Sequence, residues 1–157
     1  MDALSLSILR ARLVKNEGVS LYAYRDTRGF VTQGVGRLMS LNPAADPTNY
    51  PDIDMATAMG WLDADIAGAI AATSRYLPWF ILLDGIRQGV LVEMVFQLGI
   101  DHVLGFAKML DALQADDYVT ASDEMLNSAW HKQTPARCEQ LAEIMRTADP
   151  YAPPEDA

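Results

Sequence analysis

Residues 17–37, EGVSLYAYRDTRGFVTQGVGR, decide both the fold and the chemistry of this chain. Residues 20–35 alternate large apolar and polar side chains in a way that is typical of β-strands. Two carboxylates, Glu17 and Asp26, and the hydroxyl of Thr32 lie within the same short stretch. Whether these three groups meet depends on the turn between the two strands.

The DTRG segment predicts a tight turn between antiparallel strands, and the length of its loop sets the strand register. A two-residue loop would place Asp26 and Thr32 on opposite faces, because side chains alternate along a strand. A three-residue loop, Thr27–Gly29, with its glycine in the left-handed conformation, pairs Asp26 with Phe30 and Tyr24 with Thr32. We favour the three-residue loop, which predicts that Asp26 and Thr32 share one face.

A helix is expected before the hairpin. Leu6, Leu9 and Leu13 recur at helical spacing, which predicts an amphipathic helix that ends near residues 16–18. Glu17 follows Leu13 by four residues and is therefore expected on the same inward face. A carboxylate that continues an apolar stripe should be partly desolvated, which favours its protonated form.

The rest of the chain predicts one irregular loop followed by helices. Residues 41–53 contain three prolines and indicate a surface loop. Asp54 is a good N-cap for a long helix that ends near Tyr76. Shorter helices are expected over residues 84–98, 107–114, 117–126, 128–132 and 135–146. The proline-rich, acidic tail, residues 149–157, is expected to fray.

Together these elements predict an α+β fold in a single domain, residues 1–157. A small hairpin lobe should cover about residues 14–53, with a connecting helix over about 54–76. A mainly helical lobe should cover about residues 77–147 and include the first helix, before a tail at 148–157. The length is sufficient for one sizeable core.

Composition narrows the functional classes. The formal net charge is -9, which disfavours a nucleic-acid-binding protein because phosphate contacts need clustered Lys and Arg. Cys138 is the only cysteine, so no internal disulfide can form, and we expect it to be a buried small hydrophobe. The sequence contains no run of 18 or more apolar residues, so no membrane span is predicted. The amphipathic start does not resemble a signal peptide. We therefore expect the chain to remain in the cytoplasm after synthesis.

Glu17, Asp26 and Thr32 form the strongest candidate site. Hydrolysis of a glycosidic bond needs one carboxylic acid to protonate the leaving oxygen and one carboxylate to activate water or attack the sugar. A hydroxyl beside the second carboxylate can hold that water. The apolar helix face at Glu17 and the exposed turn at Asp26 favour different protonation states, which is how acid and base roles are assigned. The alternative is a solvated helix-end glutamate and a solvated turn aspartate.

A second cluster, QTPAR at residues 133–137, contains a possible partner for the acid. Thr134 and Pro135 predict an N-cap followed by proline at the first helical position. Arg137 then falls in the first turn, where the helix dipole disfavours a cation, so it needs a carboxylate. Glu17 is one candidate, and a simple surface arginine is the alternative.

These motifs resemble those of phage-type lysozymes, glycoside hydrolase family 24. The resemblance begins in the segment at 17–36 and continues in MVFQLG (94–99), GF (105–106), Trp130, QTPAR and RTADPY. It covers nearly the whole chain and preserves the order and spacing of the separated motifs. It implies a two-lobed α+β lysozyme fold with a saccharide cleft and no metal or organic cofactor.

The resemblance also implies roles for individual residues. Glu17 would be the general acid, and Asp26 and Thr32 would position the hydrolytic water for inversion. Arg137 would support Glu17. Leu38, Phe96 and Gln97 would bind the saccharide. The substrate would be the bond between N-acetylmuramic acid and N-acetylglucosamine in peptidoglycan.

The chain departs from the family pattern at several positions. A histidine usually follows the second glycine of the GxG motif, and Arg37 stands there instead. A structural pair between Arg37 and Asp65 is therefore expected in place of a histidine–aspartate pair. Two cleft positions that are polar in the family are Met109 and Glu124 here. The acidic charge should remove long-range attraction to the anionic cell wall.

The expected function is that of an endolysin that needs a holin-type pore to reach the cell wall. It would act as a monomer and would not insert stably into the membrane. A lysozyme-fold peptidoglycan-binding or virion structural module is the alternative from another class. A lytic transglycosylase is a further enzymatic alternative, although Asp26 and Thr32 favour hydrolysis. His102 and His131 have no companions at metal-ligand spacing.

Overall fold

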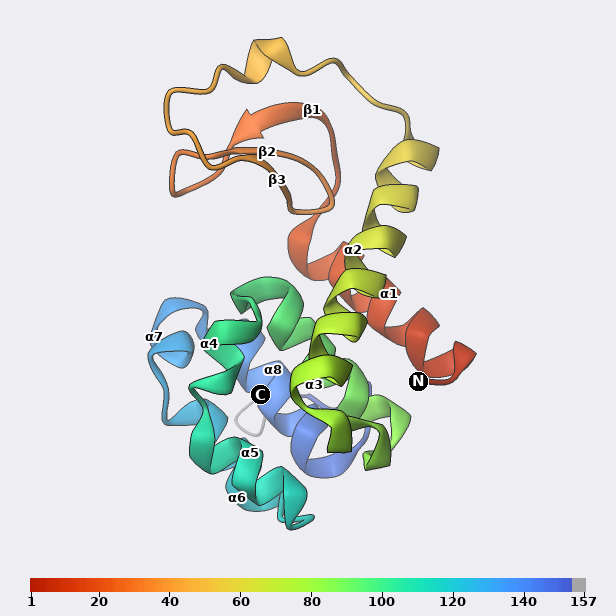
Figure 1. Ribbon diagram of the computed structural model, residues 1–157, viewed down its shortest axis with the longest axis vertical. Coiled ribbons are helices and arrows are strands. Elements are labelled where there is room, and N and C mark those ends of the chain that lie inside the picture. Colours follow the sequence, from red (N-terminus) through yellow and green to blue (C-terminus); the bar gives the residue numbers. More distant parts are fainter. Residues whose placement is uncertain (154–157) are drawn as a thin grey trace. The chain divides into compact units, whose positions relative to one another are not determined.

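The computed structural model describes residues 1–153 and confirms the α+β class (Figure 1). The strands are β1 (Ser20–Arg25), β2 (Val31–Gly34) and β3 (Arg37–Ser40). The α-helices are α1 (Ala3–Glu17), α2 (Met55–Tyr76), α3 (Gly85–Leu98), α4 (Ile100–Leu104), α5 (Ala107–Gln114), α6 (Tyr118–Leu126), α7 (Ala129–Gln133) and α8 (Pro135–Thr147). Two short 3-10 helices, η1 (Pro47–Asn49) and η2 (Pro78–Leu82), complete the described elements.

The chain divides into two compact units. The sheet unit comprises Arg10–Gly68, and the helical unit comprises Met1–Leu9 together with the chain from Ala69 onward. Both boundaries fall inside helices, α1 and α2, so the chain passes between the units as continuous helix.

The sheet has the order β1-β2-β3 with antiparallel pairing, and its first hairpin has the predicted register. Tyr24 lies opposite Thr32, and the backbone N–H of Asp26 donates to the carbonyl of Phe30 at 2.9 Å. Gly29 closes the three-residue loop with a φ of 88°, in the left-handed region that glycine adopts without steric cost. Asp26 therefore lies two residues beyond Tyr24 along the same face as Thr32.

The proline-rich segment 41–53 is anchored to the sheet rather than loose. The buried amide of Gln33 donates to the carbonyls of Leu21 and Pro51. The guanidinium of Arg25 reaches the carbonyls of Pro43 and Ala45. These bonds hold the segment against β1, and a short 3-10 helix forms within it where only a loop was predicted.

The helical unit is built around α8. This helix packs against α3, α6 and α7, and α6 also packs against α5 (Figure 1). Its inward side chains are fully buried; they are Cys138, Leu141, Ile144 and Met145. Met94 and Val95 of α3 are also buried, and Cys138 donates a weak hydrogen bond from Sγ to the carbonyl of Met125.

Several local predictions need correction. Leu9 and Leu13 are fully buried, but Leu6 is 38% exposed, so the apolar stripe of α1 is shorter than its spacing suggests. α8 begins at Pro135, yet Thr134 makes no side-chain cap and its hydroxyl instead bonds to the carbonyl of Trp130.

β3 and α4 were not predicted, because each is only four or five residues long. Residues 149–153 form a hydrogen-bonded turn rather than a frayed end, and residues 154–157 of the expected tail lie outside the described part.

Candidate active site

The carboxylate of Asp26 is held by its own turn. Oδ1 accepts the backbone N–H groups of Arg28 and Phe30 at 2.9 and 3.0 Å. Oδ2 accepts the guanidinium of Arg28, from Nε at 3.2 Å and from a terminal nitrogen at 3.1 Å. Burial raises the pKa of Asp26, but the bonds from Phe30 and Arg28 together lower this pKa below its ordinary value of 3.8. Asp26 is thus a fixed, ionised carboxylate and not the freely solvated turn aspartate of the alternative reading.

Thr32 is directed toward the same turn. Its Oγ1 lies 3.4 Å from the carbonyl oxygen of Phe30, the oxygen that also accepts the backbone N–H of Asp26. Thr32 is buried, and a contact of 3.4 Å is a weak hydrogen bond, so the hydroxyl can turn to a closer partner. The strand register places Tyr24, Thr32 and Leu38 in one row across the sheet. The structure therefore brings the carboxylate of Asp26 and the hydroxyl of Thr32 together at the turn of the hairpin.

Glu17 is the last residue of α1 and lies over the turn between β2 and β3. A Cβ atom placed on Gly36 would stand 2.7 Å from Oε2 of Glu17 and 3.0 Å from its Cδ. Gly36 has a φ of 65°, so glycine is favoured here for its backbone conformation as well as for the space that it leaves.

The phenol of Tyr24 is influenced by the charges of both Glu17 and Asp26. Burial raises the pKa of Tyr24, and the negative charges of Glu17 and Asp26 raise this pKa further. Both carboxylates must lie within electrostatic range of one phenol for this to occur. Glu17 and Asp26 thus both act on the phenol of Tyr24, and Thr32 lies opposite Tyr24 in the sheet.

Arg37 and Asp65 form a loose pair. A terminal nitrogen of Arg37 lies 3.9 Å from Oδ1 of Asp65, and the guanidinium stacks over the ring of Trp61 at 4.9 Å. Burial raises the pKa of Asp65, and the charge of Arg37 only partly offsets this rise. The stacking explains why arginine suits this position: a flat cation satisfies an aromatic face and a carboxylate together.

In the helical unit, Arg137 pairs with Glu93. Oε1 of Glu93 lies 3.2 Å from Nε and 3.1 Å from a terminal nitrogen of Arg137. Glu93 is fully buried and Arg137 is 12% exposed. Glu17, the predicted partner of Arg137, belongs to the sheet unit, so that pairing stays a prediction. The first-turn arginine does have a carboxylate partner, as the helix-dipole argument requires.

The side-chain amide of Gln97 is held by Trp130 of α7 and by Thr134 at the start of α8. Its Oε1 accepts Nε1–H of Trp130 at 3.1 Å, and its Nε2 donates to Oγ1 of Thr134 at 3.4 Å. Gln97 and its neighbour Phe96 are half-buried on α3. The amide of Gln97 is therefore positioned by α7 and the start of α8.

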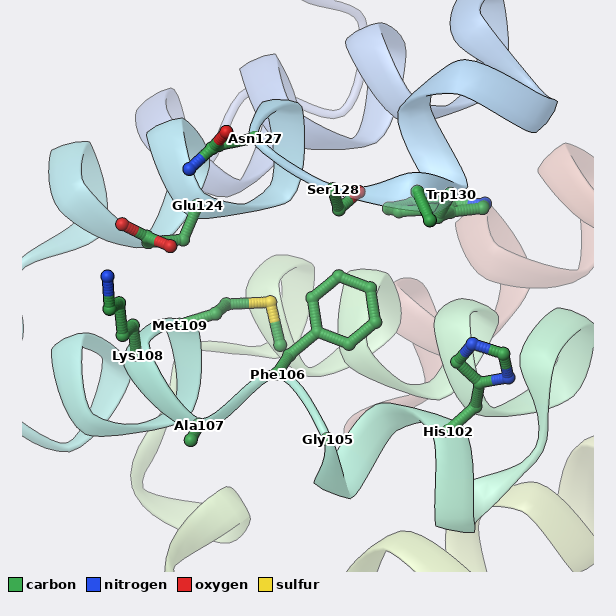
Figure 2. A pocket seen from close by; sticks show the side chains of 11 residues that line it. His102, Gly105, Phe106, Ala107, Lys108, Met109, Glu124, Asn127, Ser128 and Trp130 are labelled. Atoms are coloured by element: carbon green, nitrogen blue, oxygen red, sulfur yellow. The ribbon is translucent and has the colours of Figure 1, made fainter.

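Trp130 also belongs to a pocket of about 620 Å³ within the helical unit (Figure 2). Phe106 meets Trp130 edge-to-face with ring centroids 6.3 Å apart, and Met109 lies beside Phe106. At the other end the ammonium of Lys108 points toward the carboxylate of Glu124. The pocket thus has an apolar wall and a charged end. Its lining includes Met109 and Glu124, two of the positions at which the resemblance implies other residues.

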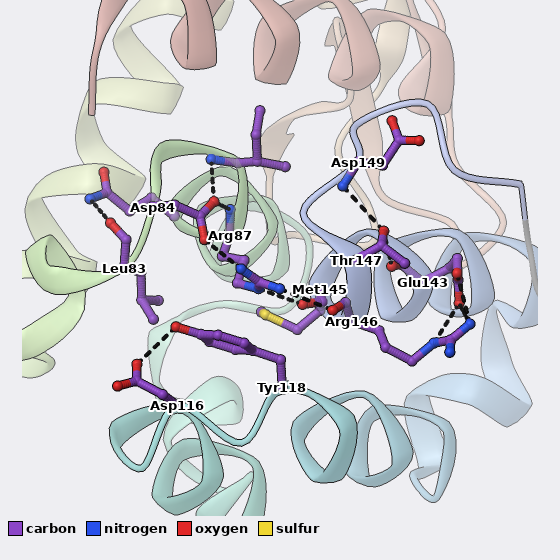
Figure 3. A network of polar contacts seen from close by, with 12 residues as sticks. Leu83, Asp84, Arg87, Asp116, Tyr118, Glu143, Met145, Arg146, Thr147 and Asp149 are labelled. Carbon is purple, nitrogen blue, oxygen red and sulfur yellow. Dashed lines mark hydrogen bonds and ion pairs between the residues drawn. The ribbon is translucent and has the colours of Figure 1, made fainter.

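A separate polar network ties the ends of α3 and α8 (Figure 3). Arg87 donates to the carbonyls of Met145 and Arg146 and pairs with Asp84, the N-cap of α3. Its guanidinium stacks on the ring of Tyr118 at 3.5 Å. This network satisfies carbonyls at the end of α8 and has a structural role.

Two absences hold for the part of the chain that the structure describes. Residues 1–153 contain no group of three or more His, Cys, Asp and Glu side chains that could hold a metal ion. Within the same residues, no helix has the length and apolar character needed to cross a membrane.

Comparison with known proteins identifies the family. The phage lysozyme family model matches residues 14–146. The chain belongs to the phage lysozyme family. It is 28% identical to probable T4-type lysozyme 1 of Dictyostelium discoideum, over 90% of this chain and 95% of that protein. It is 29% identical to the pre-baseplate central spike protein Gp5 of Enterobacteria phage T4, over 87% of this chain but only 27% of that protein. The chain is thus a glycoside hydrolase of the lysozyme type, a lysozyme-like peptidoglycan hydrolase.

Some residues of this phage lysozyme's site were not predicted from the sequence. Glu93 pairs with a residue 44 positions away, and no local pattern marks such a partner. Arg28 looked like an ordinary turn residue, although its place two residues after Asp26 allows the contact. Tyr24 was read only as a strand residue. The alternation that predicted the strand could have placed its phenol beside Asp26.

Proposed function

We propose that this lysozyme hydrolyses the β-1,4 bond between N-acetylmuramic acid and N-acetylglucosamine in peptidoglycan, with inversion. Glu17 protonates the leaving glycosidic oxygen. Asp26 accepts a proton from a water molecule on the opposite face of the sugar, and Thr32 holds that water. The reaction requires no metal ion or organic cofactor.

One observation carries the proposal: Thr32 Oγ1 and the backbone N–H of Asp26 are directed to the same carbonyl, that of Phe30. This geometry keeps the hydroxyl and the carboxylate at neighbouring points of one turn. Oδ1 of Asp26 accepts two backbone N–H groups, whereas Oδ2 accepts only from the exposed side chain of Arg28 and is the oxygen that a water molecule would approach. In this arrangement, the carboxylate can accept a hydrogen bond from a water molecule, and the hydroxyl can orient the same water.

The retained water-binding pair favours hydrolysis over transglycosylation. A lytic transglycosylase closes an anhydro ring with the sugar's own hydroxyl and needs no water. The lowered pKa of Asp26 keeps it ionised near neutral pH, which a base requires.

The helical unit supplies substrate contacts and support in this proposal. Phe96 and Gln97 bind the saccharide together with Leu38 of the sheet unit. Gln97 is suited to this because Trp130 and Thr134 fix its amide. The pocket beside Trp130 offers further surface to the same polymer. Arg137 supports the acid Glu17, and Arg137→Lys should lower kcat while leaving KM nearly unchanged.

We further propose that the enzyme acts as an endolysin. It would function as a monomer, accumulate in the host cytoplasm and reach the cell wall through a holin-type pore. Expression with and without a pore-forming partner tests this role: lysis should require both proteins. Lysis by the enzyme alone would contradict the need for a holin.

The catalytic proposal is tested by turbidity loss of chloroform-permeabilised Gram-negative cells. Glu17→Gln removes the proton donor and should lower the clearing rate by at least about 100-fold. Asp26→Asn should have a comparable effect. Asp63→Asn is the matched control, since it makes the same carboxyl-to-amide change on an exposed face of the same unit. It should clear cells at the wild-type rate.

Binding measurements separate the enzyme from a module without turnover. Both catalytic variants should still sediment with insoluble peptidoglycan, because they change the chemistry rather than the saccharide contacts. If wild-type protein sediments with peptidoglycan but releases no reducing ends, the chain is a binding or virion module. The similarity to part of a baseplate spike protein makes that the relevant second function. Undiminished clearing by Glu17→Gln would overturn the assignment of the acid.

A further inference from the structure

The side chain of Arg28 contacts the oxygen of Asp26 that the backbone leaves unused. Nε and a terminal nitrogen of Arg28 both donate to Oδ2, at 3.2 and 3.1 Å. This two-point contact fixes a planar guanidinium against a planar carboxylate. Because backbone N–H groups already hold Oδ1, Arg28 completes the hydrogen bonding of the carboxylate.

Arg28 is nevertheless open to solvent. Its side chain is 68% exposed, whereas that of Asp26 is 19% exposed. The guanidinium also lies over the ring of Phe30 at 5.5 Å, which limits the directions in which the exposed arginine can point. The exposed arginine is therefore held by its contacts with Asp26 and Phe30 rather than by burial.

We propose that Arg28 is a positioning residue for the base Asp26, holding its carboxylate in one rotamer through the two-point contact at Oδ2. The proposal rests on the hydrolytic function proposed above. Arg28 touches neither water nor sugar in this role and acts through Asp26.

Four ionisable groups bear on the charge of Asp26. The cation of Arg28 favours the ionised form directly. On β1, the pKa of Tyr24 is raised by burial and by the charges of Glu17 and Asp26. The charge of Arg25, the adjacent residue, is directed to the carbonyls of Gly29, Pro43 and Ala45. Arg28 is therefore the cation whose removal should change Asp26 most.

The test is a carbon-13 NMR titration of the Asp26 carboxyl in full-length wild-type protein and variants. At low salt, Arg28→Gln should move the Asp26 midpoint to higher pH, and Arg28→Lys should move it less, because lysine keeps the charge but loses the two-point contact. Raising the ionic strength from about 10 mM to about 1 M should raise the wild-type midpoint and leave that of Arg28→Gln nearly unchanged. Arg10→Gln, which removes an arginine from an exposed pair of the same unit, is the control and should leave the midpoint unchanged.

Kinetics on soluble peptidoglycan fragments give the second readout. Arg28→Gln should shift the acid limb of the kcat profile to higher pH and lower kcat about two- to fivefold on that limb, with KM unchanged. A midpoint for Asp26 that does not move in Arg28→Gln at low salt overturns the proposal. If the wild-type protein releases no reducing ends, the hydrolytic function fails, while the titration still decides whether Arg28 controls Asp26.

Discussion

The Arg137–Glu93 pair of the helical unit differs in exposure from the arginine–carboxylate pairs of the sheet unit. In the helical unit, Glu93 is fully buried against an arginine that is 12% exposed. In the sheet unit, Asp26 and Arg28, and likewise Arg37 and Asp65, are open to solvent on at least one side. A buried pair cannot change partners without a large cost, whereas an exposed pair can. The difference is consistent with the proposal that the helical unit supports the site and the sheet unit carries the proton transfers.

Removing one partner of the buried pair should have the largest effect on stability. Glu93→Ala leaves Arg137 without this carboxylate in the core and should cost about 3–5 kcal/mol in the free energy of unfolding. Asp63→Ala breaks the exposed pair of Asp63 with Arg10 and should cost less than about 1 kcal/mol. Chemical denaturation of both variants measures the contrast. Equal losses would remove the distinction between the units.

Gly36→Ala should affect activity more than stability. An added Cβ would stand 2.7 Å from Oε2 of Glu17 and should displace the acid, which can lower kcat by up to about 100-fold. The left-handed backbone adds a strain of about 1–2 kcal/mol. Gly99→Ala is the control, because Gly99 has a φ of 82° and no atom near its added Cβ. With a ψ of 155°, Gly99 has a conformation that is essentially restricted to glycine, so this variant should lose at least as much stability and still retain activity. Equal activity in the two variants would contradict the contact with Glu17.

Asp65→Asn should have the smallest effect, below about 1 kcal/mol at neutral pH, because its pair with Arg37 is long and partly exposed. The pKa of Asp65 is raised in the folded state, so the native protein binds this proton more tightly than the unfolded chain. Wild-type stability relative to the variant should therefore increase as the pH falls from the raised folded pKa to the ordinary value of 3.8. Urea unfolding across that pH range measures the difference, and a relative stability that falls with decreasing pH would contradict it.

The same comparison explains what the sequence could predict. The turn that holds Asp26 follows from local rules: a left-handed glycine closes a three-residue loop, and alternation then places Thr32 on the same face. The start of α8 at Pro135 is equally local. The contacts between side chains of the helical unit do not follow from local rules. Gln97 meets Thr134, and Glu93 meets Arg137, only through packing of α3 against the α7–α8 region, and no pattern within either segment specifies the contact.

Burial was the other quantity that the sequence did not determine. Leu6 continues the spacing of Leu9 and Leu13 but is exposed, because burial at the end of a helix depends on what covers it. Met109 replaces a residue that is polar in the family and is fully buried in the pocket wall. Asp26 was expected on an exposed turn, but its side chain is only 19% exposed because Arg28 and the turn cover it.

The stereochemistry of the first product tests the central claim most directly. Proton NMR of the newly formed reducing end, recorded before mutarotation, distinguishes the possible mechanisms. Water activated by Asp26 and Thr32 on the face opposite the leaving group predicts that the α-anomer appears first from the β-linked substrate. A β-anomer would indicate a covalent intermediate, and a 1,6-anhydro end would indicate a reaction without water; either result would contradict the account.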